Sequence, residues 1–153
     1  MLAYDGKCRT FDMYADGYVR GEGVACLVLS RQDVMMREQT KTLQVPYGVI
    51  RSSVVNQDGK SACFTAPNAN SQKQLLTKAL KRAHLLPKDI AYLESHGTGT
   101  ALGDPIECEG IRGVYIDNDS LSVSSTFTST PLVMGAVKTN IGHLEAAAGI
   151  AGL

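Results

Sequence analysis

Two short histidine-containing motifs hold the residues of this chain that could do chemistry. Residues 96–100 read His-Gly-Thr-Gly-Thr, and residues 138–143 read Lys-Thr-Asn-Ile-Gly-His. In each case an apolar run gives way to small residues, which is where a parallel-sheet protein presents side chains and backbone amides to a ligand. Two imidazoles at one site can stabilise a developing negative charge while a third group attacks carbon. His96 and His143 are therefore the candidate catalytic pair.

The cysteines are the obvious source of an attacking group or of metal ligands. They are Cys8, Cys26, Cys63 and Cys108. They lie far apart and form no CxxC pair, so the sequence predicts neither a metal site nor a disulfide framework. This usage favours a reduced, cytoplasmic location, and no cysteine can be assigned as the nucleophile. A small metalloprotein using His96, His143 and a cysteine is an alternative that metal analysis would test.

The composition of the chain predicts one globular unit. Its 153 residues are 44% hydrophobic and 20% charged, which is enough to build a core. The 15 basic and 15 acidic residues give a formal net charge of +0, so we expect no nucleic-acid or membrane-surface partner. No apolar run approaches the roughly 20 residues of a membrane span, and the start of the chain has no signal-peptide core. The apolar stretch at 146–153 resembles a buried helix without a stop signal, so we expect the chain to be a piece of a longer protein.

Alternating strand and helix patterns predict the elements that must position the histidines. Short apolar runs predict buried strands at 24–29, 45–55, 90–93 and 132–137. Capping residues and apolar spacing predict helices at 68–84, at 104–115 and from 144 onward, and a Ser/Thr-rich surface loop is expected at 117–130. The third and fourth strands would deliver His96 and His143. Strands that alternate with helices argue for an α/β layered sheet.

Six stretches, in order along the chain, resemble the β-ketoacyl synthase (ketosynthase) domain of type I polyketide synthases and fatty-acid synthases. They are residues 11–23, 56–61, 65–68, 94–100, 102–107 and 137–149. The resemblance implies a partial thiolase-like fold, in which the layered α/β sheet is incomplete. It implies a single partial ketosynthase domain over residues 1–153, made of the end of the N-terminal half and most of the core of the C-terminal half. It also implies that the cysteine nucleophile lies before residue 1 and that the intact domain is a homodimer.

The activity implied by the resemblance is a decarboxylating Claisen condensation. An acyl thioester on the cysteine reacts with a malonyl-type extender, which is carried on the phosphopantetheine of an acyl carrier protein. The resemblance thus implies acyl carrier protein and thioesters as partners, with no cofactor bound by this domain. His96 and His143 match the family's catalytic histidines, which would donate hydrogen bonds to the enolate oxygen.

The resemblance also assigns roles to residues around the histidines. Thr98 and Thr100 match positions whose hydroxyls bind the pantetheine amides, which are neutral donors and acceptors. Lys138 and Glu107 match a buried polar network that orients and tunes the site, and a buried ammonium needs such a partner. Asp104 is expected to serve the structure of the same loop.

Two further expectations concern the surroundings and the rival function. Asp16, Arg20 and Glu22 are expected to form a local ion network, and Glu145 is expected to stabilise the first turn of the last helix. The rival function is a non-elongating or chain-length-factor-like ketosynthase relative, which would bind acyl carrier protein without condensing. The residue at the upstream cysteine position would separate the two, because only a cysteine can form the acyl thioester.

Overall fold

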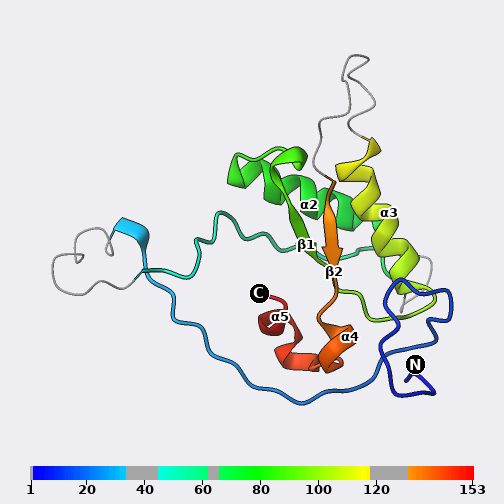
Figure 1. Ribbon diagram of the computed structural model, residues 1–153. Coiled ribbons are helices and arrows are strands. Elements are labelled where there is room, and N and C mark those ends of the chain that lie inside the picture. The colour runs from blue at the N-terminus through cyan, green and yellow to red at the C-terminus, as the bar shows by residue number, and fades with distance from the viewer. Residues whose placement is uncertain (1, 34–44, 62–65, 118–130) are drawn as a thin grey trace.

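A two-stranded parallel sheet lies at the centre of the computed structural model, which describes residues 2–33, 45–61, 66–117 and 131–153 (Figure 1). Its strands are β1 (Tyr92–Glu94) and β2 (Val133–Gly135), paired in the register Tyr92 with Val133. The helices are α2 (Ala69–Ala83), α3 (Gly103–Tyr115), α4 (Lys138–Ile141) and α5 (Ala148–Ala151), with 3₁₀ turns at Pro87–Asp89 and Glu145–Ala147.

The helix predicted at 68–84 is confirmed as α2. The side-chain oxygen of Asn68 accepts the backbone N–H groups of Asn70 and Ser71, which caps the start of the helix. At the other end His84 adopts a left-handed conformation, with φ 56°. The apolar stripe of α2 then packs against α3.

The packing of α2 against α3 forms the main core of the described residues. The buried apolar side chains of these helices are Leu80, Ala83, Ile111 and Val114. The helices come close at Gly110, where an added Cβ would lie 3.1 Å from the Cβ of Gln72. The predicted helix at 104–115 is confirmed and begins one residue earlier, at Gly103.

The parallel pairing decides where the chemistry-bearing segments meet. The third and fourth predicted strands are confirmed as the shorter β1 and β2, and α3 makes the crossover between them. Because paired parallel strands point the same way, their carboxyl ends lie at one edge of the sheet. The segments that carry His96 and His143 therefore leave the sheet side by side.

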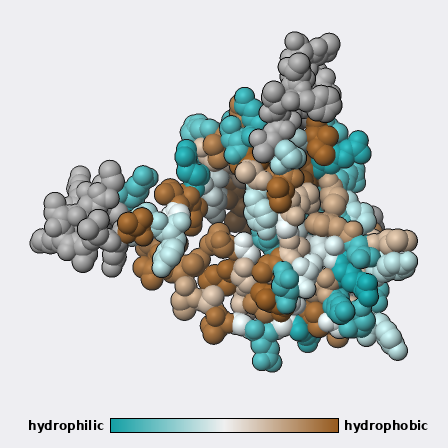
Figure 2. All heavy atoms as spheres, viewed as in Figure 1, coloured by the Kyte–Doolittle hydropathy of each residue, from teal (hydrophilic) through white to brown (hydrophobic). Residues whose placement is uncertain are grey.

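The strands predicted at 24–29 and 45–55 are wrong for this structure. Residues 24–29 run along an open arc around the body of the molecule, and Figure 2 shows hydrophobic side chains gathered on the side of this arc (Figure 1). Residues 45–55 return toward α2, where Ser52 donates to the carbonyl of Ala79 and Arg82 donates to the carbonyl of Ser53. Val24 is 92% and Val28 98% exposed. An apolar strand needs neighbouring strands that satisfy its backbone, and the sheet of the described residues contains only β1 and β2.

The helix predicted from residue 144 onward is confirmed as a short helical segment. Residues 145–151 form a 3₁₀ turn and a short α-helix, of which only Ala148 is buried. The burial expected for the whole apolar stretch at 146–153 is wrong for this structure, since Leu153 is 77% exposed. Most of the predicted loop at 117–130 lies outside the described residues, as does Cys63.

Candidate active site

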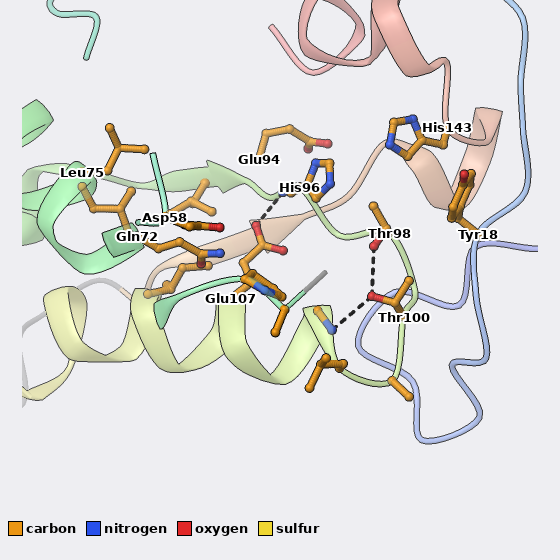
Figure 3. Close-up of a pocket in the computed structure, with 18 of the residues that line it drawn as sticks. Tyr18, Asp58, Gln72, Leu75, Glu94, His96, Thr98, Thr100, Glu107 and His143 are labelled. Atoms are coloured by element: carbon orange, nitrogen blue, oxygen red, sulfur yellow. Dashed lines mark hydrogen bonds between the residues drawn. The ribbon is translucent and has the colours of Figure 1, made fainter. Parts of the chain in front are cut away.

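The two histidines converge at the carboxyl edge of the sheet. The ring centroids of His96 and His143 lie 5.6 Å apart and the rings meet edge to face, at 86° (Figure 3). His96 follows β1 and His143 follows the short helix α4. The two imidazoles can therefore reach one shared atom.

Backbone contacts fix the position and the tautomer of His143. Its N–H donates to the carbonyl of Val19 at 2.7 Å, and its carbonyl accepts the N–H of Gly21 at 3.0 Å. The backbone N–H of Glu145 donates to Nδ1 of the ring at 2.9 Å. Because Nδ1 accepts this bond, the proton of the neutral ring is on Nε2. His143 therefore presents an N–H donor at Nε2.

The glycine before His143 permits this arrangement. Gly142 has φ 75°, in the region where side chains are strained. An added Cβ would lie 3.1 Å from the backbone nitrogen of Gly21 and 3.2 Å from the carbonyl of Val19. A larger residue at 142 would therefore push His143 away from residues 19–21, whose backbone holds it by hydrogen bonds.

A carboxylate on α3 binds the backbone at His96 and so fixes its position. Glu107 accepts the N–H groups of His96 at 2.6 Å and Gly97 at 2.9 Å. Burial lowers the pKa of His96, and the nearby Lys138 ammonium lowers it further, against the opposing effects of Glu107 and Asp104. The His96 imidazole is thus kept neutral further into the acidic range.

The pKa of His143 is lowered as well. Burial is the main cause, followed by the charge that His96 would carry and by Lys138, while Glu145 opposes them. Two neutral imidazoles at close range are good hydrogen-bond donors to an oxyanion, and neither repels the other.

Lys138 is buried as predicted, with 5% of its surface exposed. The polar network expected for Lys138 and Glu107 contains no ion pair between them among the described residues, because the Glu107 carboxylate binds backbone N–H groups. The two groups shift the pKa of His96 in opposite directions because they carry opposite charges: the Lys138 ammonium lowers it and the Glu107 carboxylate raises it.

The two threonines lie on the glycine loop that follows His96. The hydroxyls of Thr98 and Thr100 are 3.3 Å apart, and the oxygen of Thr100 also accepts the N–H of Gly103 at 3.1 Å. Thr100 thus helps to cap α3, while Thr98 is buried but for 8% of its surface. Both side chains line the same cavity as the histidines.

Asp104 ties this loop to the N-terminal segment. Its carboxylate accepts the backbone N–H groups of Gly99, Thr100 and Phe11, at 3.1, 3.3 and 2.8 Å. The expected structural role of Asp104 is therefore confirmed. The partner at residue 11 was not foreseen, because no sequence spacing connects it with residue 104.

One cavity of about 900 Å³ is lined by the predicted site residues other than Lys138 (Figure 3). Its lining includes His96, Thr98, Thr100, Glu107 and His143. The sequence missed Tyr18, which lines the same cavity with its ring centroid 5.2 Å from that of His143. Tyr18 is distant in sequence from His143 and lies in no helix or strand pattern, so the sequence carries no signal that predicts this contact.

The predicted ion network of Asp16, Arg20 and Glu22 is wrong. Arg20 instead pairs with Glu145, with 2.9 Å between Nε and Oε1. Asp16 accepts the backbone N–H of Tyr4 at 3.3 Å. Neighbours in sequence suggested a local network, but the strand-like segment at 19–21 lies beside residues 143–145 and offers Arg20 a partner there.

No described cysteine lines the cavity. Cys8 is buried and hydrogen-bonded to the backbone of Val19, and Cys26 is exposed. Burial raises the pKa of the Cys108 thiol, which disfavours the thiolate. Within the described part of the chain, no three His, Cys, Asp or Glu side chains gather to hold a metal ion.

Comparison with known protein families shows which family the chain belongs to. The sequence profile of "Beta-ketoacyl synthase, C-terminal domain" matches residues 47–153, and that of "Beta-ketoacyl synthase, N-terminal domain" matches residues 1–34. The chain belongs to the β-ketoacyl synthase family. The resemblance stated from its motifs is thereby confirmed.

Relatives of this ketosynthase chain are polyketide synthases. It is 51% identical, over its whole length, to one of the proteins that make up the phenolphthiocerol/phthiocerol polyketide synthase of Mycobacterium tuberculosis, and 45% identical over 99% of its length to polyketide synthase GfsA of Streptomyces halstedii. The chain spans 6% of the first protein and 2% of the second.

Solved ketosynthases share the fold. The oxazolomycin ketosynthase domain of Streptomyces albus matches with a TM-score of 0.86 at 38% identity, and the ketosynthase from module 6 of the bacillaene synthase of Bacillus subtilis with 0.85 at 41%. Each match covers 99% of this chain and about a quarter of the other, at 24% and 25%. The predicted partial thiolase-like α/β fold is therefore confirmed. Among the described residues, no helix has the length and apolar character needed to cross a membrane.

Proposed function

We propose that the protein carrying this chain catalyses the decarboxylating Claisen condensation of an acyl thioester with a malonyl-type extender on acyl carrier protein, in polyketide biosynthesis. The convergence of His96 and His143, with 5.6 Å between ring centroids at the wall of one cavity, carries the proposal. The family membership supports it, because the relatives with matching sequences are polyketide synthases.

The histidines act where negative charge develops. When the malonyl carboxylate leaves as carbon dioxide, its electron pair passes to the α-carbon and onto the thioester oxygen as an enolate. Nε2–H of His143 and a ring nitrogen of His96 donate hydrogen bonds to that oxygen. One preorganised donor of this kind is worth about 3–4 kcal/mol of transition-state stabilisation. The enolate carbon then attacks the acyl thioester and displaces the cysteine thiolate.

The other predicted residues serve binding and tuning. Thr98 and Thr100 hold the pantetheine arm by hydrogen bonds to its amides, since both line the cavity. Lys138 and Glu107 set the protonation and orientation of His96, as their opposite effects on its pKa support. No metal or resident cofactor takes part in this scheme.

The acylated cysteine belongs to another part of the intact protein in this proposal. The surroundings of Cys8, Cys26 and Cys108 support this, because none of the three lines the cavity. The domain organisation that follows is an end of the N-terminal half joined to most of the C-terminal core. We infer acyl carrier protein as the partner, a homodimeric assembly and a cytoplasmic location for the intact protein.

The test is His143→Ala in the intact protein, with acyl loading and malonyl decarboxylation measured separately. We expect loading to persist and decarboxylation to fall about 100- to 1,000-fold, because one oxyanion donor is lost. His84→Asn is the control: His84 is exposed at the end of α2, and asparagine suits its left-handed backbone. Near-normal chain extension by His143→Ala would contradict the proposal.

The same assay separates the rival function. A non-elongating relative would bind acyl carrier protein but would form no acyl thioester on the protein, so acyl loading and chain extension would both be absent even in the unmodified protein. Acyl loading followed by chain extension in the unmodified protein excludes that alternative, because without a cysteine thioester the enolate has no acyl group to attack.

A further inference from the structure

Two segments far apart in sequence are joined directly behind His143. Residues 19–21 and 143–145 are linked by the two backbone hydrogen bonds between Val19, Gly21 and His143. The ion pair of Arg20 and Glu145 adds a side-chain link across the same junction, at 2.9 Å. The residue that forms this ion pair, Glu145, is therefore also the residue whose backbone N–H donates to the His143 ring.

Glu145 adopts a backbone conformation that it does not favour by itself. Its φ is 49°, in the left-handed region where a residue with a Cβ is strained. In this conformation its N–H donates to Nδ1 of His143 at 2.9 Å. A strained conformation persists only where surrounding contacts hold it. The side-chain contact in position to do so is the ion pair with Arg20.

We propose that Arg20 and Glu145 are positioning residues for His143: their ion pair keeps residue 145 left-handed, so that its N–H occupies Nδ1 and the ring proton stays on Nε2. The inference deepens the proposed function, on which it rests, because Nε2–H is the donor to the enolate oxygen. Neither side chain contacts substrate. Both act through the orientation and tautomer of His143.

The size of the effect follows from exposure. The side chains of Arg20 and Glu145 are 66% and 52% exposed, and ion pairs so open to water contribute little by themselves. We therefore expect Arg20→Ala to lower the rate of malonyl decarboxylation by about two- to fivefold. This is far smaller than the effect of removing the histidine.

Glycine at position 145 separates the backbone from the ion pair. Glu145→Gly removes the carboxylate but also removes the strain, because glycine adopts positive φ at no cost. We expect it to retain a near-normal decarboxylation rate, whereas Glu145→Ala, which keeps a Cβ and loses the pair, is slowed about fivefold. In the Glu145→Gly background, Arg20→Ala is expected to cause no further loss.

Arg112→Ala is the matched control. Arg112 pairs with Asp117 at 3.3 Å, and their side chains are 69% and 51% exposed, much like those of Arg20 and Glu145. This pair lies at the end of α3, away from the cavity lining. We expect its removal to leave the decarboxylation rate unchanged.

A second readout reports the tautomer without requiring activity. In the intact protein labelled with ¹⁵N-histidine, the His143 signals are assigned by their loss in His143→Ala. We expect one protonated and one unprotonated nitrogen in the unmodified protein and in Glu145→Gly, and averaged nitrogen shifts in Arg20→Ala. Because this measurement needs no condensation activity, it tests the positioning role of Arg20 and Glu145 even if the proposed function is wrong.

Two results would overturn the inference. One is an Arg20→Ala protein whose rate and nitrogen signals match those of the unmodified protein. The other is a loss on Arg20→Ala that is equally large with glycine and with glutamate at position 145, since Arg20 would then act by a route other than Glu145.

Discussion

Replacing Asp104 with asparagine should expose how the threonine loop is held. The carboxylate is 4% exposed and accepts three backbone N–H groups. One oxygen binds Gly99 and Thr100, and the other binds Phe11. An amide offers one acceptor oxygen and two donor hydrogens, so it can replace only one of the two oxygens.

The cost follows from the bond that must be lost. If the amide oxygen keeps Gly99 and Thr100, the amide NH₂ faces the N–H of Phe11, and two donors oppose each other. A hydrogen bond to a charged group contributes about 1.5–3 kcal/mol, and a buried donor without an acceptor costs about 1–3 kcal/mol. We expect Asp104→Asn to lower the free energy of unfolding of the intact protein by about 3 kcal/mol.

Chemical denaturation measures this difference, with Asp12→Asn as its control. Asp12 is exposed and accepts one backbone N–H, from Tyr14 at 2.8 Å, so we expect its replacement to cost less than about 0.5 kcal/mol. At moderate temperature the Asp104→Asn protein should also show a raised KM for the malonyl carrier, because Thr98 and Thr100 share the loosened loop. Equal stability of the two variants would refute the reasoning that this carboxylate joins the loop to the N-terminal segment.

The remaining predictions concern the charge and the hydroxyls of the cavity. The lowered pKa of each histidine should keep both rings neutral below the ordinary value of 6.5, so the decarboxylation rate should fall only at more acidic pH. Lys138→Met removes a cation that lowers the pKa of His96; the pKa should rise, and the acidic limb of the pH–rate profile should move to higher pH. An unmoved limb would contradict the placement of Lys138. Thr98→Val should raise the KM for a pantetheine-borne substrate with little change in stability, whereas Thr100→Val should also cost about 1 kcal/mol of unfolding free energy, because its oxygen caps α3. Equal stability of the two threonine variants in denaturation would contradict that distinction.

Sequence reasoning succeeded where a structure depends on nearby residues. Helix α2 has its cap, its apolar stripe and its left-handed end within one segment, so the pattern at 68–84 is sufficient. Strands β1 and β2 find each other within the described chain, and their parallel pairing brings the two histidine motifs together. The convergence of His96 and His143 follows from this pairing, whereas the roles of Thr98, Thr100, Lys138 and Glu107 were predicted from the resemblance to ketosynthases.

The same reasoning failed where a strand or an ion pair depends on partners that are distant in sequence. Residues 24–29 have the composition of a buried strand, yet composition does not reveal whether neighbouring strands are present to pair with it. Ion pairs between distant segments are equally hidden. Arg20 has acidic neighbours in sequence and binds none of them in the structure, because the backbone bridge to His143 brings Glu145 closer.

The N-terminal segment is the part of the molecule that unites the two histidine loops. On the side of His96, the hydroxyl of Thr10 donates to the carbonyl of Gly97 at 2.6 Å, and the N–H of Gly17 donates to the carbonyl of Gly99 at 2.9 Å. On the side of His143, the carbonyl of Val19 accepts the histidine N–H.

These contacts cross between the two parts that the family profiles distinguish, residues 1–34 and residues 47–153. Both histidines belong to the C-terminal part, but the backbone that sets their spacing belongs to the N-terminal part. The sheet alone brings the two loops to one edge and leaves the orientation of each ring open. A segment bonded to both loops removes that freedom, and preorganised donors are effective because their orientation is set before charge develops. The distance between the two imidazoles is therefore a property of the junction between the two parts, and neither part contains enough of the site to determine it.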